Sequence, residues 1–195
     1  PTNNDKTRKK KTDMKKIAWI LAAALLAGTA APAQTIAPFK DGDRVVYLGN
    51  SITDGGHYHS YIWLYYMTRF PEMNLRMYNA GIGGETAGGM FKRLDGDVFS
   101  KRPTVLTVTF GMNDTGYMEY NGDNPEAFGE ARYKECFENY KKMEKRLEGL
   151  DGVRVVMIGS SPYDETARIE GNTPLRGKNA VMQRVVEFQK ASADA

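Results

Sequence analysis

Three short segments of the 195-residue sequence concentrate the residue types that can do chemistry. Ser51 lies in the first segment, 49–56 (GNSITDGG), where its hydroxyl is a candidate nucleophile. The second, 79–89 (NAGIGGETAGG), is rich in glycine, which lets backbone N–H groups approach a ligand closely. The third, 111–116 (GMNDTG), offers the side-chain amide of Asn113. Each segment alone also fits a plain turn, with Ser51 as a helix cap and Asn113 bonded to its own backbone.

Three better-known glycine motifs do not fit these segments. The nucleophile elbow G-x-S-x-G needs glycine at position 53, where the sequence has Thr53. The dinucleotide fingerprint G-x-G-x-x-G needs glycine at position 86, where it has Thr86. The glycines before Lys178 have the wrong spacing for a phosphate-binding loop. A nucleotide or flavin binder is therefore the weakest of the functions that such loops suggest.

Each of the three segments follows a short run that is typical of a strand. Apolar or alternating runs predict strands at 44–48, 75–78, 105–110 and 153–158. Helical spacing predicts a buried helix over 59–70, a helix over 90–99 broken at Gly96, one from Asn124-Pro125 to Gly149, and an amphipathic helix around 181–189. Cys136, the only cysteine, falls on the apolar stripe of the third helix, which favours a buried small side chain over a nucleophile.

A strand, a loop and a helix thus alternate four times. This order favours a parallel sheet with helices on both faces. In such a sheet the carboxyl ends of the strands, and the loops after them, lie at one edge, where ligands bind. We therefore expect the three polar, glycine-rich segments to meet in one crevice.

In this order, VVYLGNSITDGG, NAGIGGETAGG and VTFGMND resemble three sequence blocks of the SGNH hydrolases, also called the GDSL esterase/lipase family. The resemblance covers roughly residues 44–190, in a domain that we place at 40–195. It implies a three-layer α/β/α sandwich with a doubly wound parallel sheet. It implies that Ser51 is the nucleophile and that the N–H groups of Ser51 and Gly84, with the amide of Asn113, form the oxyanion hole. The family chemistry needs no metal or organic cofactor.

The implied function is serine ester hydrolysis through an acyl-serine intermediate, with small-molecule, carbohydrate or lipid esters as substrates. Removal of acyl groups from polysaccharides is one form that this activity takes. The physical requirements agree with the assignment, because ester cleavage develops negative charge on the carbonyl oxygen and donors aimed at that oxygen lower the barrier. The alternative is a non-catalytic binding protein that keeps the crevice but has no general base.

Two departures from the family pattern bear on activity. Asn50 stands where an aspartate usually precedes the serine, so we expect a changed supporting hydrogen bond. The family's C-terminal Asp-x-x-His, which supplies the general base, is absent, and the only histidines are His57 and His59. We expect both histidines to lie at the surface or at the edge of the substrate site. A His-x-His pair without a third ligand is also a weak metal site. We therefore expect the domain to be truncated before its last strand and this fragment to be inactive alone.

Residues 1–33 have the features of a targeting segment and not of the folded domain. Residues 14–33 combine two lysines, an apolar stretch and Ala-Pro-Ala, as a cleaved signal peptide does, so we expect export to the periplasm or medium. Residues 1–13 read as sequence upstream of the true start at Met14. Seven of the 27 Lys and Arg but only two of the 24 Asp and Glu lie in residues 1–33, which therefore carry +5, against −2 for the rest. The remaining chain offers no net attraction for nucleic acid.

Overall fold

A four-stranded parallel sheet lies at the centre of the computed structural model, which describes residues 36–167 and 174–194. Its strands are β1 (Arg44–Gly49), β2 (Arg76–Gly81), β3 (Val105–Val108) and β4 (Arg154–Met157), in the order β2-β1-β3-β4. The α-helices are α2 (Ser51–Asp54), α3 (His57–Arg69), α4 (Ala87–Lys92), α5 (Pro125–Leu147) and α6 (Lys178–Ala193). The parallel pairing of all four strands confirms the predicted α/β sandwich. The predictions for residues 1–33 lie outside the described residues.

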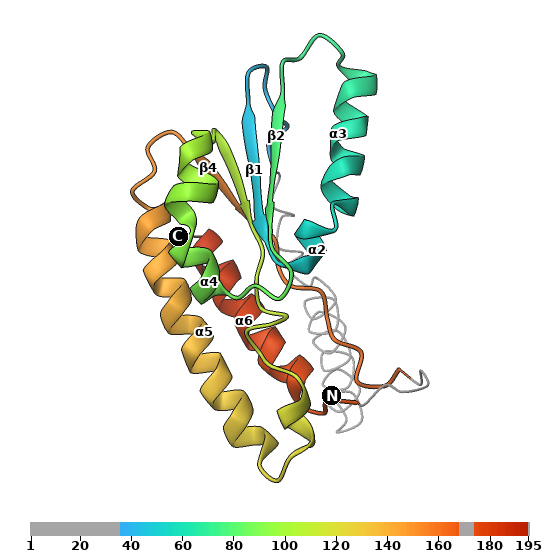
Figure 1. Cartoon of the computed structure of the whole chain (residues 1–195), viewed down its shortest axis with the longest axis vertical. Coiled ribbons are helices and arrows are strands. Elements are labelled where there is room, and N and C mark those ends of the chain that lie inside the picture. The colour runs from blue at the N-terminus through green and yellow to red at the C-terminus, as the bar shows by residue number, and fades with distance from the viewer. Residues whose placement is uncertain (1–35, 168–173, 195) are drawn as a thin grey trace, which may run out of the picture. The chain divides into compact units, whose positions relative to one another are not determined.

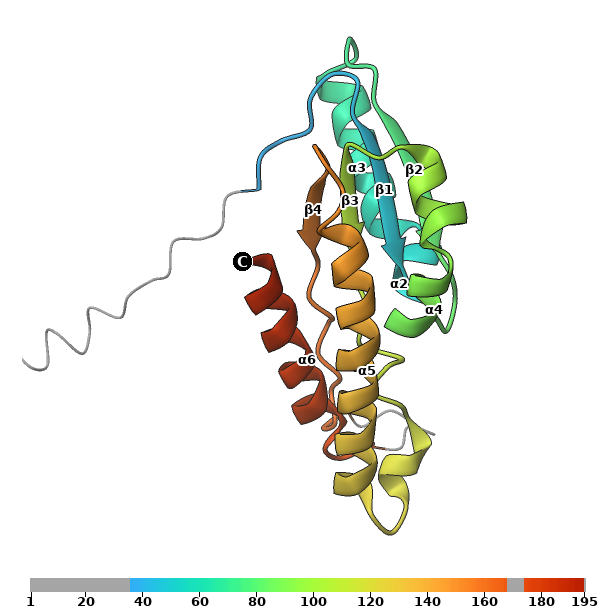
Figure 2. The same ribbon diagram turned by 90° about the vertical axis from the view of Figure 1, so that its left-hand side faces the viewer.

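Helices cover both faces of this sheet. Figure 1 shows α3 on one side of β1 and β2, with α4, α5 and α6 on the other. Figure 2 shows α5 and α6 side by side on their face of the sheet, where they are in contact. None of the helices in residues 36–167 and 174–194 combines the length and apolar character needed to span a bilayer.

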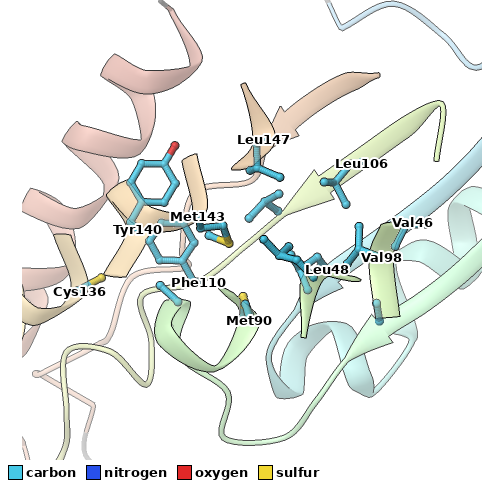
Figure 3. Packing of buried hydrophobic residues seen from close by; sticks show 14 of the residues in the cluster. Val46, Leu48, Met90, Val98, Leu106, Phe110, Cys136, Tyr140, Met143 and Leu147 are labelled. Atoms are coloured by element: carbon cyan, nitrogen blue, oxygen red, sulfur yellow. The ribbon is translucent and has the colours of Figure 1, made fainter. Parts of the chain in front are cut away.

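Strand β1 lies between β2 and β3 in the sheet, and both of its faces are buried because helices pack against them. Val45 and Tyr47 pack with Tyr58 and Ile62 of α3. The alternate side chains enter the larger core on the opposite face, as the two-residue period of a strand requires. This core is built from β1, β3 and the helices α4, α5 and α6, and Figure 3 shows part of it. The residues labelled there are Val46, Leu48, Met90, Val98, Leu106, Phe110, Cys136, Tyr140, Met143 and Leu147.

Helix α5 begins and packs as predicted. The side chain of Asn124 accepts a hydrogen bond from the N–H of Ala127, and Pro125 occupies the first helical position. Cys136 is 2% exposed, and burial raises the pKa of its thiol, with Asp114 as a further cause. Its interpretation as a buried small side chain is confirmed. The predicted last amphipathic helix is also confirmed, since α6 buries Val181 and Val185.

The expected burial of the helix at 59–70 was wrong. Helix α3 begins at His57, and none of its residues is buried. Tyr61 is 70% exposed and Leu64 is 57% exposed. Only one side of the helix faces the sheet, so the aromatic and aliphatic residues on its other sides are not enclosed by the described chain. Composition predicted the helix correctly but could not predict how many of its sides are covered.

Several boundaries also differ from the prediction, including those of β3 and β4, which are shorter than predicted. Strand β2 continues to Gly81, whereas a loop was expected from residue 79, because β1 supplies a partner for each residue up to the pair Gly49–Gly81. The helix predicted over 90–99 begins earlier, after the cap residue Thr86, and α4 ends at Lys92. It is followed by a π-helical turn, η1 (Leu94–Val98), and a 3-10 turn, η2 (Phe99–Lys101). A further 3-10 turn, η3 (Met118–Asn121), precedes α5.

The end of β2 packs so closely against α2 that only glycine fits at position 81. A Cβ at Gly81 would lie 2.1 Å from the backbone nitrogen of Asp54, whereas a Cβ at Gly83 would meet nothing nearer than 3.7 Å. We predict that Gly81→Ala lowers the free energy of unfolding by about 1–3 kcal/mol, the usual cost of overpacking. The free energy of unfolding of the matched control Gly83→Ala should stay close to that of the wild type. Urea denaturation followed by circular dichroism measures both, and equal midpoints for the two variants would contradict this packing.

Candidate active site

The first loop presents Ser51 at the start of a short helix. Strand β1 ends at Gly49, and Asn50 caps α2. The Asn50 side-chain oxygen accepts a hydrogen bond from the N–H of Ile52 at 3.1 Å, while its backbone oxygen accepts from Thr53 at 3.0 Å and Asp54 at 2.9 Å. Asn50 thus binds three of the first four N–H groups of the helix, and the N–H of Ser51 is left for another acceptor. Ser51 itself is exposed.

The departure at Asn50 does not remove this cap. An amide oxygen accepts the hydrogen bond from Ile52 in the way that an aspartate oxygen would. The hydrogen bond from the N–H of Ile52 to the side chain at position 50 is therefore not the one that the replacement of aspartate by asparagine would change. Asn50 is 2% exposed, so the cap lies inside the protein, beneath the serine that it positions.

His59 contacts the backbone of α2. Its Nε2 lies 3.0 Å from the backbone oxygen of Thr53, and its ring stacks on Tyr47 with the centroids 4.8 Å apart. His57 is exposed at the start of α3. Of the two histidines, His59 has its Nε2 engaged with the backbone, which suits a structural role better than that of a general base.

The second loop begins where β2 ends. Gly84 has φ of +76°, a left-handed conformation that favours glycine, and it is exposed. Thr86 caps α4, since its hydroxyl oxygen accepts a hydrogen bond from the N–H of Gly89 at 3.4 Å. Asn79, within β2, donates from its side chain to the backbone oxygen of Asp54 at 3.1 Å, which joins the second segment to the first.

The third loop fixes the orientation of the Asn113 amide. Its Nδ2 donates to the backbone oxygen of Glu85 at 2.8 Å, and its Oδ1 accepts a hydrogen bond from the hydroxyl of Tyr117 at 2.8 Å. The bond to Glu85 uses one of the two hydrogens on Nδ2, so the other can serve a ligand. The half-buried Asn113 is therefore tied directly to the residue that follows Gly84.

Asp114 joins the second and third loops from inside the protein. Its Oδ1 accepts a hydrogen bond from the N–H of Ala87 at 2.8 Å, and its Oδ2 accepts from the N–H of Gly111 at 2.9 Å. Burial raises the pKa of this carboxyl, while the two N–H donors act in the opposite direction. Only the bond to Gly111 fits the plain-turn interpretation of the sequence, because Ala87 lies 27 residues away.

Two basic residues under the loops were not found from the sequence. Arg93, at the end of α4, donates hydrogen bonds to backbone oxygens of β1 and β2. Lys178 is fully buried, and its Nζ donates to the backbone oxygens of Met112 and Gly116 and to a hydroxyl in the third loop. Burial lowers the pKa of Lys178 to about 8. No local pattern signals either role, because their partners lie far away in the sequence.

The topology gives the three predicted site residues a common edge. Ser51, Gly84 and Asn113 follow β1, β2 and β3, which are neighbours in the sheet. Hydrogen bonds join the second segment to α2 and to the third segment. The arrangement supports the predicted set, while the meeting of all three donors around one atom stays a prediction. Within residues 36–167 and 174–194, no three His, Cys, Asp or Glu side chains form a group that could hold a metal ion.

Comparison with known proteins places this arrangement in a family. The model of the GDSL-like lipase/acylhydrolase family matches residues 47–195. A solved gut microbial diltiazem-metabolizing enzyme is 63% identical, with a TM-score of 0.80 over 83% of this chain and 36% of that one. An acetylxylan esterase of Geobacillus stearothermophilus is 27% identical over 88 residues, which are 37% of this chain and 40% of that protein.

A solved catalytic mutant of an acetylxylan esterase from Geobacillus stearothermophilus shares the fold. Its TM-score is 0.60 at 20% identity, over 80% of this chain and 75% of that one. This chain thus spans only 36% and 40% of the lengths of the two relatives named first. Because the family match runs through most of the sequence and includes all three loops, the chain belongs to the GDSL-like lipase/acylhydrolase family.

Proposed function

We propose that this chain carries the nucleophile and the oxyanion hole of a serine ester hydrolase. The observation that carries the proposal is the linkage of three loops at the carboxyl ends of adjacent parallel strands, with the exposed Ser51 at the start of α2. Family membership supports the same reaction class.

The reaction proceeds by acyl transfer. The Ser51 Oγ attacks the ester carbonyl carbon while a general base takes its proton, and the carbonyl oxygen becomes negatively charged. The N–H groups of Ser51 and Gly84 and the Asn113 amide donate hydrogen bonds to this oxygen. Collapse of the intermediate expels the alcohol, which takes the proton back from the base. Water, activated by the same base, then attacks the acyl-serine, releases the carboxylic acid and restores the Ser51 hydroxyl.

We infer that the general base lies outside this 195-residue sequence. His59 is engaged with the backbone of Thr53, and no Asp-x-x-His follows the third loop. The 63%-identical solved relative is much longer than the matched segment, which leaves room for a base in the full-length protein.

The names of the relatives favour acetyl esters as substrates. One relative is a diltiazem-metabolizing enzyme, and others are acetylxylan esterases, whose name specifies the removal of acetyl groups from xylan. We therefore propose acetyl groups on small molecules or polysaccharides as the substrate class. The signal-peptide pattern of residues 14–33 supports a place of action outside the cytoplasm.

Replacement of the nucleophile tests the reaction class. In the full-length protein we expect Ser51→Ala to reduce hydrolysis of p-nitrophenyl acetate to background, because the acyl-enzyme cannot form. The neighbouring Ser60→Ala, on the exposed start of α3, is the matched control and should keep wild-type activity. Undiminished hydrolysis by Ser51→Ala would remove Ser51 as the nucleophile.

Truncation of Asn113 tests the oxyanion hole. We expect Asn113→Ala to lower kcat by about 10²–10³, the usual cost of one lost donor, with a much smaller change in KM. Steady-state kinetics with p-nitrophenyl acetate measures both parameters. A variant in which only KM changes would place Asn113 in ground-state binding.

Comparison of the fragment with the full-length protein tests the source of the base. We expect the 195-residue chain alone to hydrolyse p-nitrophenyl acetate barely above background, because it lacks a positioned base. Activity of the folded fragment close to that of the full-length protein would show that this sequence supplies its own base. Absence of Ser51-dependent hydrolysis in the full-length protein would favour the binding-protein alternative.

A further inference from the structure

The guanidinium of Arg93 occupies the junction beneath the proposed oxyanion hole. We propose that Arg93 is a positioning residue for ester hydrolysis, which acts by holding the backbone segments that carry all three oxyanion donors. This inference rests on the proposed function and adds to it a residue that contacts neither the substrate nor the nucleophile.

Four acceptors surround this guanidinium. Its Nε donates to the Glu85 carboxylate at 2.7 Å, and its Nη1 to the Asp97 carboxylate at 3.1 Å. Its Nη2 donates to the backbone oxygens of Ala80 at 2.8 Å and Gly49 at 3.3 Å. The planar fork of an arginine can reach carboxylates and carbonyls in several directions at once, which a lysine ammonium on a flexible chain does less well.

Two of these acceptors lie close in sequence to a proposed donor. Gly49 precedes Ser51 by two residues and ends β1. Glu85 follows Gly84 directly, and its backbone oxygen accepts the hydrogen bond that orients Asn113. A displacement of the Glu85 backbone would therefore move the N–H of Gly84 and release the amide of Asn113. Loss of the bond to Gly49 would free the backbone segment that leads from β1 to Ser51.

The Arg93–Glu85 pair is well enclosed, so the loss of either partner is costly. Both side chains are 14% exposed, against 46% for Asp97. Glycine at position 89 makes the enclosure possible, because a Cβ there would lie 1.6 Å from Oε1 of Glu85. Removing one member of an enclosed charged pair leaves the other without compensation, so the second loop would rearrange when Arg93 is lost.

The test replaces Arg93 in the full-length protein and separates kcat from KM. We expect Arg93→Met to lower kcat for p-nitrophenyl acetate by about 10- to 100-fold, since small misplacements of catalytic groups cost factors of this size. KM should change by less than about threefold, because the loss falls on the transition state. Arg93→Lys should recover only part of the loss. Arg146→Met is the matched control, because Arg146 pairs with the exposed Asp95 and touches none of the three loops; its kcat should stay within about twofold of wild type.

A double-mutant cycle distinguishes positioning from general stability. If Arg93 acts through the oxyanion hole, Arg93→Met should lower kcat by a clearly smaller factor in the Asn113→Ala background than in the wild type, because one of the three donors that it positions is already missing. A merely structural residue would give the same factor in both backgrounds. Should Arg93→Met fail to fold, Glu85→Gln, which keeps the side-chain shape but weakens the ion pair, replaces it in the same cycle.

The outcomes separate this inference from the proposed function. A Ser51-dependent esterase in which Arg93→Met leaves kcat unchanged, or in which its effect is additive with Asn113→Ala, overturns the role of Arg93 and leaves the reaction class standing. A full-length protein without Ser51-dependent hydrolysis overturns the proposed function and the role of Arg93 together. A non-additive loss of kcat at nearly constant KM supports the role.

Discussion

The parallel pairing of β1 with β2 and β3 is the constraint on which the rest of the structure depends. Gly49 pairs with Gly81, and Leu48 pairs with Val108, so the three strands reach the same level at their carboxyl ends. Loops that are far apart in the sequence therefore start from one edge. The serine, the glycine-rich turn and the asparagine become neighbours through strand register, which local sequence alone does not impose.

Buried polar contacts then hold this edge in place. Asp114 binds two backbone N–H groups from different loops, Arg93 binds the ends of β1 and β2, and Lys178 fills the turn that carries Asn113. Groups that bind a developing charge are effective when they are oriented before the reaction begins. These charged residues lie beneath the loops and satisfy backbone groups there, which is a physical means of keeping the donors in position.

Local sequence predicted most of the helices and strands, but it could not predict which of their sides are packed against other parts of the chain. The apolar runs of β1 and β3 and the Asn124-Pro125 start of α5 depend on neighbouring residues, so pattern and propensity sufficed. The exposure of α3 and the extension of β2 to Gly81 depend on what lies beside them in the fold. For the same reason Ser51 and Asn113 stood out in their motifs, whereas Arg93, whose partners Gly49 and Ala80 come from two strands, did not.

The proposed oxyanion hole requires three donors around one oxygen atom, and a crystal structure of the full-length protein after reaction with an alkyl phosphonate ester tests this arrangement. A phosphonylated serine resembles the tetrahedral intermediate, with one oxygen in place of the oxyanion. We expect the adduct on Ser51 Oγ, with that oxygen about 2.7–3.1 Å from the backbone nitrogens of Ser51 and Gly84 and from Nδ2 of Asn113. An adduct on another residue, or an oxygen that points away from Gly84 and Asn113, would contradict this arrangement.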